Sequence, residues 1–135
     1  MNSLDELVEK YIDSVIIHGK KSWDGDPKTA NKHFILYTKC YIQICKYGKE
    51  GEQVLKTLLN HESHFVRCAA AYHLLPFDSE VGLKMLKKCK NQPDGVGFNA
   101  KILLSEWNSG NLMFPVGKED KILYVTVTNF HRYSK

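Results

Sequence analysis

The feature that most constrains this chain is a helical hairpin pattern that occurs twice along the sequence. Residues 58–75 predict the end of one helix, a polar turn and a second helix rich in alanine. A shift of thirty residues superposes four pairs of apolar or small residues: Leu55 and Met85, Val66 and Val96, Ala70 and Ala100, and Leu74 and Leu104. Repeated hairpins bury their apolar faces against one another, so the sequence predicts a stacked helical array with one continuous surface for partners.

The ends of the second helix in this hairpin are marked by particular residue types. Ser63 is placed to cap the helix by accepting a bond from a free backbone N–H near its start. Pro76 cannot continue a helix, so the helix is expected over 64–75. The small side chains at 69–71 allow a neighbouring backbone to approach closely.

Five further helices are predicted from helical spacing of apolar residues. Ser3 and Glu6 have the spacing of a capping box, and Gly19 is the expected end of the first helix. Asp26 is the expected cap of a second helix that opens at Pro27 and continues to Gly48. The remaining helices are expected near 50–60, near 79–90 with Asp78 or Ser79 as cap, and at 96–109 with Gly110 after it.

The C-terminal residues depart from this helical pattern. Residues 121–129 are rich in β-branched and aromatic side chains and predict a strand, which can pair with 112–114 as a hairpin. Pro115 restricts the first arm to a sheet edge. An isolated hairpin is only marginally stable, so this one must pack on the helices or pair with another chain. We therefore expect a helical array over 1–117, a strand-like tail over 118–135, and either a monomer or a dimer formed through that strand.

Composition excludes several classes of protein. The chain has 135 residues, is 43% hydrophobic and 25% charged, and carries a net charge of +4. Such a mild excess of positive charge disfavours a dedicated nucleic-acid domain. No apolar run reaches the length needed to span a bilayer, so we expect a soluble protein without membrane contacts. The four cysteines are interpreted as small core residues and, with a start that lacks a signal-peptide pattern, favour the cytoplasm.

Several blocks of sequence occur together in one order. They are Leu-Val-Glu-Lys-Tyr (7–11), Gly-Asp-Pro-Lys-Thr-Ala-Asn-Lys (25–32), Leu-Leu-Asn-His-Glu-Ser-His-Phe-Val-Arg (58–67), Ala-Ala-Ala-Tyr-His-Leu-Leu-Pro (69–76) and Val-Gly-Phe-Asn-Ala-Lys-Ile-Leu-Leu-Ser-Glu-Trp (96–107). Through these blocks the chain resembles a family of small uncharacterised bacterial HEAT-like proteins. The resemblance implies an all-α, HEAT-like α-α superhelix of about six helices in three hairpins, followed by a short C-terminal strand or hairpin. It further implies a role as an interaction module or an immunity protein, and it implies no catalytic residues.

The sequence holds few candidates for chemistry. His61 and His64 lie three residues apart, which suggests a metal site, but this spacing straddles a turn and is typical of polar groups at a helix start. His73 lies on an apolar helix face and is interpreted as a hydrogen-bonded core residue rather than a ligand. No nucleophile motif or phosphate-binding loop occurs. We therefore expect no enzyme activity, no metal and no cofactor.

Two further residues admit both a structural and a binding interpretation. Arg67 either pairs with a carboxylate of an adjoining hairpin or lines the inner surface, and the structural interpretation is favoured. Trp23 lies in a predicted linker and either folds onto the core or anchors a partner.

The function predicted from these observations is non-catalytic binding of another protein, whose identity the sequence does not reveal. The second helix of each hairpin is expected to form the surface, with His64, Arg67, Tyr72 and Lys101 as candidate contacts. If the partner is a toxin, the mechanism is occlusion of its active site. The alternative is a nucleic-acid-binding or alkylated-base repair protein that uses Lys84, Lys87 and Lys88, although a solvated outer face explains these lysines better.

Overall fold

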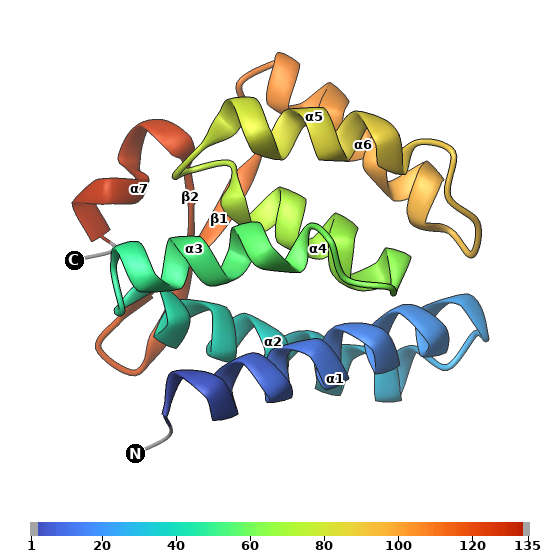
Figure 1. Ribbon diagram of the computed structural model, residues 1–135, viewed down its shortest axis with the longest axis horizontal. Coiled ribbons are helices and arrows are strands. Elements are labelled where there is room, and N and C mark those ends of the chain that lie inside the picture. The colour runs from blue at the N-terminus through green and yellow to red at the C-terminus, as the bar shows by residue number, and fades with distance from the viewer. Residues whose placement is uncertain (1–2, 134–135) are drawn as a thin grey trace.

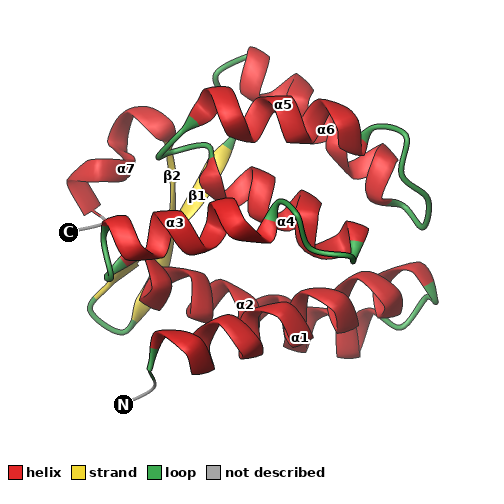
Figure 2. Cartoon of the chain, viewed as in Figure 1, coloured by secondary structure: helices red, strands yellow, loops and turns green. Residues whose placement is uncertain are grey.

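The computed structural model describes residues 3–133, and these form seven helices and one two-stranded antiparallel sheet (Figures 1 and 2). The elements are α1 (Leu4–Trp23), α2 (Pro27–Cys45), α3 (Lys49–Leu58), α4 (His64–Leu74), α5 (Ser79–Cys89), α6 (Val96–Asn108), β1 (Met113–Lys118), β2 (Lys121–Thr126) and α7 (Val127–Tyr133). The first six helices form three pairs that lie one above another, and the C-terminal elements lie across one end of the stack (Figure 1). The predicted mainly helical fold with a C-terminal hairpin is thereby confirmed.

The first helix starts as predicted but ends later. The side chain of Ser3 accepts a hydrogen bond from the backbone N–H of Glu6 at 3.2 Å, which confirms the capping interaction. Gly19 does not end the helix, because α1 continues to Trp23. A Cβ atom at Gly19 would overlap the ring of Phe65, so this glycine allows α4 to pack closely on α1. Its role is in packing and not in helix termination.

Helix α4 is the centre of the molecule, and it contacts α1, α3, α5 and α6. Its inward face consists mainly of small and aliphatic residues. Four of them have almost no exposed surface: Val66, Ala70, Ala71 and Leu74. The small side chains allow helices to pack on several sides of one axis. A shift of thirty residues along the sequence aligns α3 with α5 and α4 with α6. Both hairpins therefore occur where the sequence repeat predicts them.

Three of the four predicted caps are confirmed, namely Ser3, described above, Asp26 and Asp78. Oδ1 of Asp26 accepts a hydrogen bond from the N–H of Thr29, and Oδ1 of Asp78 accepts one from the N–H of Val81. Ser63 precedes α4 as expected, but its hydroxyl makes no capping bond. Its own N–H instead donates to Nδ1 of His61 at 3.0 Å, which closes the turn between α3 and α4.

The interpretation of all four cysteines as free core residues is wrong for two of them. Cys68 on α4 and Cys89 on α5 form a disulfide, although 21 residues separate them. Cys40 and Cys45 on α2 are free. Because disulfides are rare in reducing compartments, cysteine usage no longer favours the cytoplasm. Among residues 3–133, no helix combines the length and the apolar character needed to cross a membrane.

The C-terminal hairpin packs on the helices of the same chain. Strands β1 and β2 pair antiparallel, with Pro115 opposite Tyr124, so the expected boundary at 117 falls inside the hairpin. The strand predicted over 121–129 ends at Thr126, and residues 127–129 belong to α7. This helix directs Phe130 into the core, where its ring meets Phe77 edge-on with centroids 5.3 Å apart. Burial of that ring offsets the β propensity of the preceding residues.

Candidate binding cavity

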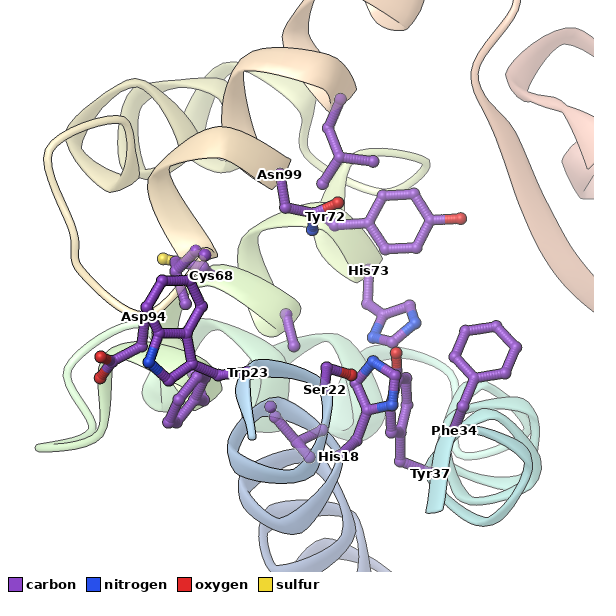
Figure 3. Close-up of a pocket in the computed structure, with 17 residues that line it drawn as sticks. His18, Ser22, Trp23, Phe34, Tyr37, Cys68, Tyr72, His73, Asp94 and Asn99 are labelled. Carbon is purple, nitrogen blue, oxygen red and sulfur yellow. The ribbon is translucent and has the colours of Figure 1, made fainter. Parts of the chain in front are cut away.

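A cavity of about 460 Å³ opens between α1, α2, α4 and α6 (Figure 3). Aromatic side chains from three of these helices form much of its wall. They are Trp23 from α1, Phe34 and Tyr37 from α2, and Phe65 and Tyr72 from α4. Cavities of this size with mainly apolar walls and a few polar groups are typical ligand sites in proteins.

Helical periodicity explains why these residues meet. Val15, His18, Gly19 and Ser22 recur at three- and four-residue intervals, so α1 presents all four on one face. Helix α4 does the same with Phe65, Cys68, Ala69 and Tyr72. Gly19 and Ala69 have almost no side-chain volume, and their small size leaves space between the larger rings.

Tyr37 is the centre of the aromatic wall. Its ring meets His18 and Phe34 edge-on, with centroids 5.4 Å and 5.3 Å apart. It also meets His73 edge-on, with centroids 5.8 Å apart. Edge-to-face contacts of this kind stabilise aromatic pairs beyond their area of contact. The rings of the wall are therefore packed against one another and not only against the backbone.

His18 provides a hydrogen-bond acceptor in this wall. Its Nδ1 lies 2.9 Å from the carbonyl oxygen of Ala30. A carbonyl oxygen can only accept, so Nδ1 must carry the hydrogen in this contact. In the neutral imidazole, Nε2 of His18 then has a free lone pair.

His73 lies deeper and is held neutral by burial. Its side chain is almost completely buried, and burial lowers the pKa of His73 to about 3. The hydroxyl of Tyr41 donates to the carbonyl oxygen of His73, and the two rings stack with centroids 4.0 Å apart. The interpretation of His73 as a hydrogen-bonded core residue is confirmed.

One acidic group lies at the mouth of the cavity, beside an indole ring. Asp94 and Trp23 come from different segments and lie side by side at one end of the cavity (Figure 3). The residue after Asp94 packs against this ring, since a Cβ at Gly95 would lie 3.4 Å from the indole of Trp23, an ordinary contact distance. Nε2 of His64 lies 3.5 Å from Oδ2 of Asp94, and within residues 3–133 this nitrogen is buried without a hydrogen-bond partner. The two side chains form an ion pair only when the imidazole of His64 is protonated.

Two of the four predicted partner contacts lie at or near the cavity. Tyr72 lines it, while its hydroxyl donates to the carbonyl oxygen of Met113 and its ring stacks on Phe114. His64 reaches the cavity mouth only through Asp94.

The other two predicted contacts lie elsewhere. Arg67 donates from Nη1 to the carbonyl oxygens of His61 and Glu62, at 2.8 Å and 2.9 Å. Its structural role is therefore to hold the turn between α3 and α4, through backbone oxygens and not through the expected carboxylate. Lys101 is exposed and lines a separate groove between α5 and α6 with Lys87 and Lys90.

The lysines of the nucleic-acid alternative are all exposed on α5. Lys87 lines the groove, whereas Lys84 and Lys88 do not. The sequence suggested a group of Lys84, Lys87 and Lys88 because all three lie along one helix. In the tertiary structure, Lys87 instead lies in one groove with Lys90 and Lys101.

Several cavity residues were not predicted as a site. His18 and Tyr37 lie on the consecutive helices α1 and α2, whereas Asn99 lies far along the chain on α6, and their shared signal is only that each lies next to apolar residues on a helix face. In the part of the chain that the structure describes, no three His, Cys, Asp or Glu side chains are grouped so that they could hold a metal ion.

Comparisons with protein-family models, curated proteins and solved structures find no significant match to this chain.

Proposed function

We propose that this protein is a non-catalytic, HEAT-like module that binds another protein, with the aromatic cavity at the centre of its binding surface. The observation that carries the proposal is the open aromatic cavity with Trp23 at its mouth, where 62% of that side chain is exposed. Exposed aromatic residues beside a preformed pocket are typical of the anchor regions of protein interfaces.

Further apolar side chains surround this cavity. Phe98 on α6 is 73% exposed and lies on the same helix as Asn99, which lines the cavity, although Phe98 itself is not part of the lining. Tyr124 of β2 is also exposed; burial is the main cause of the raised pKa of Tyr37 and Tyr72, and the nearby Tyr124 phenol adds to it, so Tyr124 lies near the same wall. Exposed apolar residues that gather in one region indicate an interaction site, whereas scattered ones do not.

The HEAT-like description rests on the stacking of three helical pairs and on the thirty-residue repeat. The second helix of each pair, α2, α4 and α6, contributes to the cavity wall. A surface assembled from equivalent helices of successive pairs is the usual binding face of such arrays. If the partner is a toxin, binding would occlude its active site through an interface of roughly 1,200–2,000 Å².

Capture of a partner by three forms of the purified protein tests this proposal. The first is the unaltered chain, the second carries Trp23→Ala and Phe98→Ala, and the third carries Ile35→Ala and Leu36→Ala. Ile35 and Leu36 are exposed on α2 but are absent from the cavity lining, so the third form is a matched control. We expect one protein to bind the first and third forms in equal amounts and the second form at least tenfold less. Equal capture by all three forms would exclude the cavity as the binding surface.

A nucleic-acid role is the second candidate, and the lysine groove between α5 and α6 favours it. Replacing Lys87, Lys90 and Lys101 with Gln should abolish duplex binding and reduce its salt dependence, if this function is correct. Replacing Lys84 and Lys88, which lie outside the groove, should have a smaller effect. Unchanged duplex binding in the triple variant would reject this candidate.

A further inference from the structure

We propose that the aromatic cavity recognises an organic cation, which the partner protein supplies as the side chain of a lysine or arginine. The source of the cation rests on the proposed function, whereas the preference of the cavity for a cation rests on the cavity alone. The electrostatics, the aromatic walls and the hydrogen-bonding groups each support this preference.

The charge of the cavity favours a cation. Its lining contains one carboxylate, that of Asp94, and neither lysine nor arginine. The pKa of His73 is lowered to about 3, so this histidine adds no positive charge at neutral pH. The carboxylate of Asp94 is 42% exposed at the mouth, where it shares its surroundings with Nε2 of His64 at 3.5 Å, so an entering cation meets an opposite charge there.

The aromatic side chains of the cavity wall also favour a cation. The face of an aromatic ring carries negative electrostatic potential and attracts ammonium and guanidinium groups, and indole does so most strongly. Trp23 lies beside Asp94 at the mouth, and Phe34 and Tyr37 line the wall across the cavity (Figure 3). A cation that passes Asp94 would therefore remain close to aromatic rings.

The polar groups of the cavity match a donor-only ligand. An ammonium group carries three donors and no acceptor. The lone pair on Nε2 of His18 and the amide oxygen of Asn99 are acceptors on different helices (Figure 3). The hydroxyl of Ser22 is a third. These groups supply acceptors for the donors of an ammonium group that enters the cavity.

Choline and its uncharged isostere 3,3-dimethylbutan-1-ol test the charge preference directly, because they share shape and differ in charge. In a Trp107→Phe background Trp23 is the sole tryptophan, since the chain has two. Its fluorescence then reports on the cavity mouth. We expect choline to bind at least about fivefold more tightly than the isostere, which corresponds to about 1 kcal/mol of cation–π and ionic attraction. Equal binding of the two compounds, or absence of choline binding, would overturn the inference.

Asp94→Asn tests the contribution of the carboxylate. Asp94 has a positive φ of 60°, a conformation that asparagine tolerates well, so the backbone should be retained. We expect this variant to bind choline about five to thirty times more weakly and the isostere unchanged. Glu106→Gln is the control, because it removes the same charge from α6 outside the cavity lining. An equal loss in both variants would indicate a general effect of net charge and would contradict the inference.

The source of the cation is tested with blocked amino acids. N-acetyl-lysine-N-methylamide should bind and the norleucine analogue, which lacks the amine, should not. If choline binds and neither the lysine compound nor the corresponding blocked arginine does, a side chain of a partner is excluded as the source. Failure of this inference is separable from failure of the proposed function, because the capture experiment with Trp23→Ala and Phe98→Ala does not depend on a cation.

Discussion

The hydroxyl of Tyr11 lies 2.6 Å from Nδ1 of His73, and this buried contact joins α1 to α4 across 62 residues of sequence. Tyr41 stacks on the other side of the same imidazole. The three residues connect the first helical pair to the central helix, directly behind the wall of the cavity. Their hydrogen bonds and their neutral charge state should therefore control both stability and the shape of the binding site.

Tyr11→Phe should destabilise the protein by about 1–3 kcal/mol, because it leaves Nδ1 of His73 buried without its partner. Urea denaturation of both proteins measures this difference. A double-mutant cycle with His73→Leu should show that loss of both polar partners costs less than the sum of the two single changes. Strict additivity would mean that the hydrogen bond contributes little.

Stability should fall as the pH is lowered below about 6.5. The pKa of His73 is about 3 in the folded chain and about 6.5 in an ordinary environment, so between these values the unfolded chain binds a proton that the folded chain does not. The free energy of unfolding should therefore decrease by up to about 1.4 kcal/mol per pH unit in this window. Denaturation between about pH 4.5 and 6.5 measures this slope above the range in which carboxylates such as Asp78 titrate.

His73→Gln is the control for this pH dependence, and it should remove the part of the slope that comes from His73. Identical slopes in the variant and the unaltered chain would show that another group is responsible.

Gly19→Ala should destabilise the protein, although alanine is favoured over glycine in an exposed helix by about 1 kcal/mol. The added methyl group would overlap the ring of Phe65 and force this side chain to move, which should cost about 1–3 kcal/mol. Thermal denaturation gives the sign of the effect. Introduction of Phe65→Leu in the same chain should relieve the overlap, so alanine at 19 should cost less there than in the presence of Phe65.

Reduction of the Cys68–Cys89 disulfide should lower stability by about 3 kcal/mol, because the bond closes a loop with a separation of 21 residues in the unfolded chain. Denaturation with and without a thiol reductant measures this loss. In a Cys89→Ser variant the reductant should have no effect. Alkylation of the denatured, unreduced chain should modify two thiols, and modification of four would show that the bond does not form.

Phe130→Ala should destabilise the whole protein by about 3–5 kcal/mol, because the ring is fully buried between the C-terminal hairpin and the helices. Phe98→Ala is the matched control, since that ring is exposed and its removal should change stability by less than about 0.5 kcal/mol. A small effect at Phe130 would show that the tail does not contribute to the core.

Much of the helical fold was predictable from sequence because its signals are local. Ser3, Asp26 and Asp78 cap helices through bonds to backbone groups three residues away, and apolar spacing marks the buried face of each helix. The candidate site was less predictable. Of the four predicted contacts, Tyr72 lines the cavity and His64 lies beside Asp94 at its mouth, whereas Arg67 and Lys101 lie elsewhere, because the direction of each side chain depends on the packing of neighbouring helices.

The sequence by itself determined the existence and order of the first six helices, three of the four predicted caps and the hairpin pattern at thirty-residue spacing. Only the tertiary structure decided which helices approach closely enough for Gly19 to meet Phe65, for Cys68 to bond Cys89 and for Phe130 to enter the core in a helix. The same packing assembled Trp23, Tyr37 and Asp94 around one cavity. Local signals act over a few residues, whereas contacts such as Cys68–Cys89 and Tyr11–His73 join residues 21 and 62 positions apart, and their approach depends on the packing of every helix between them.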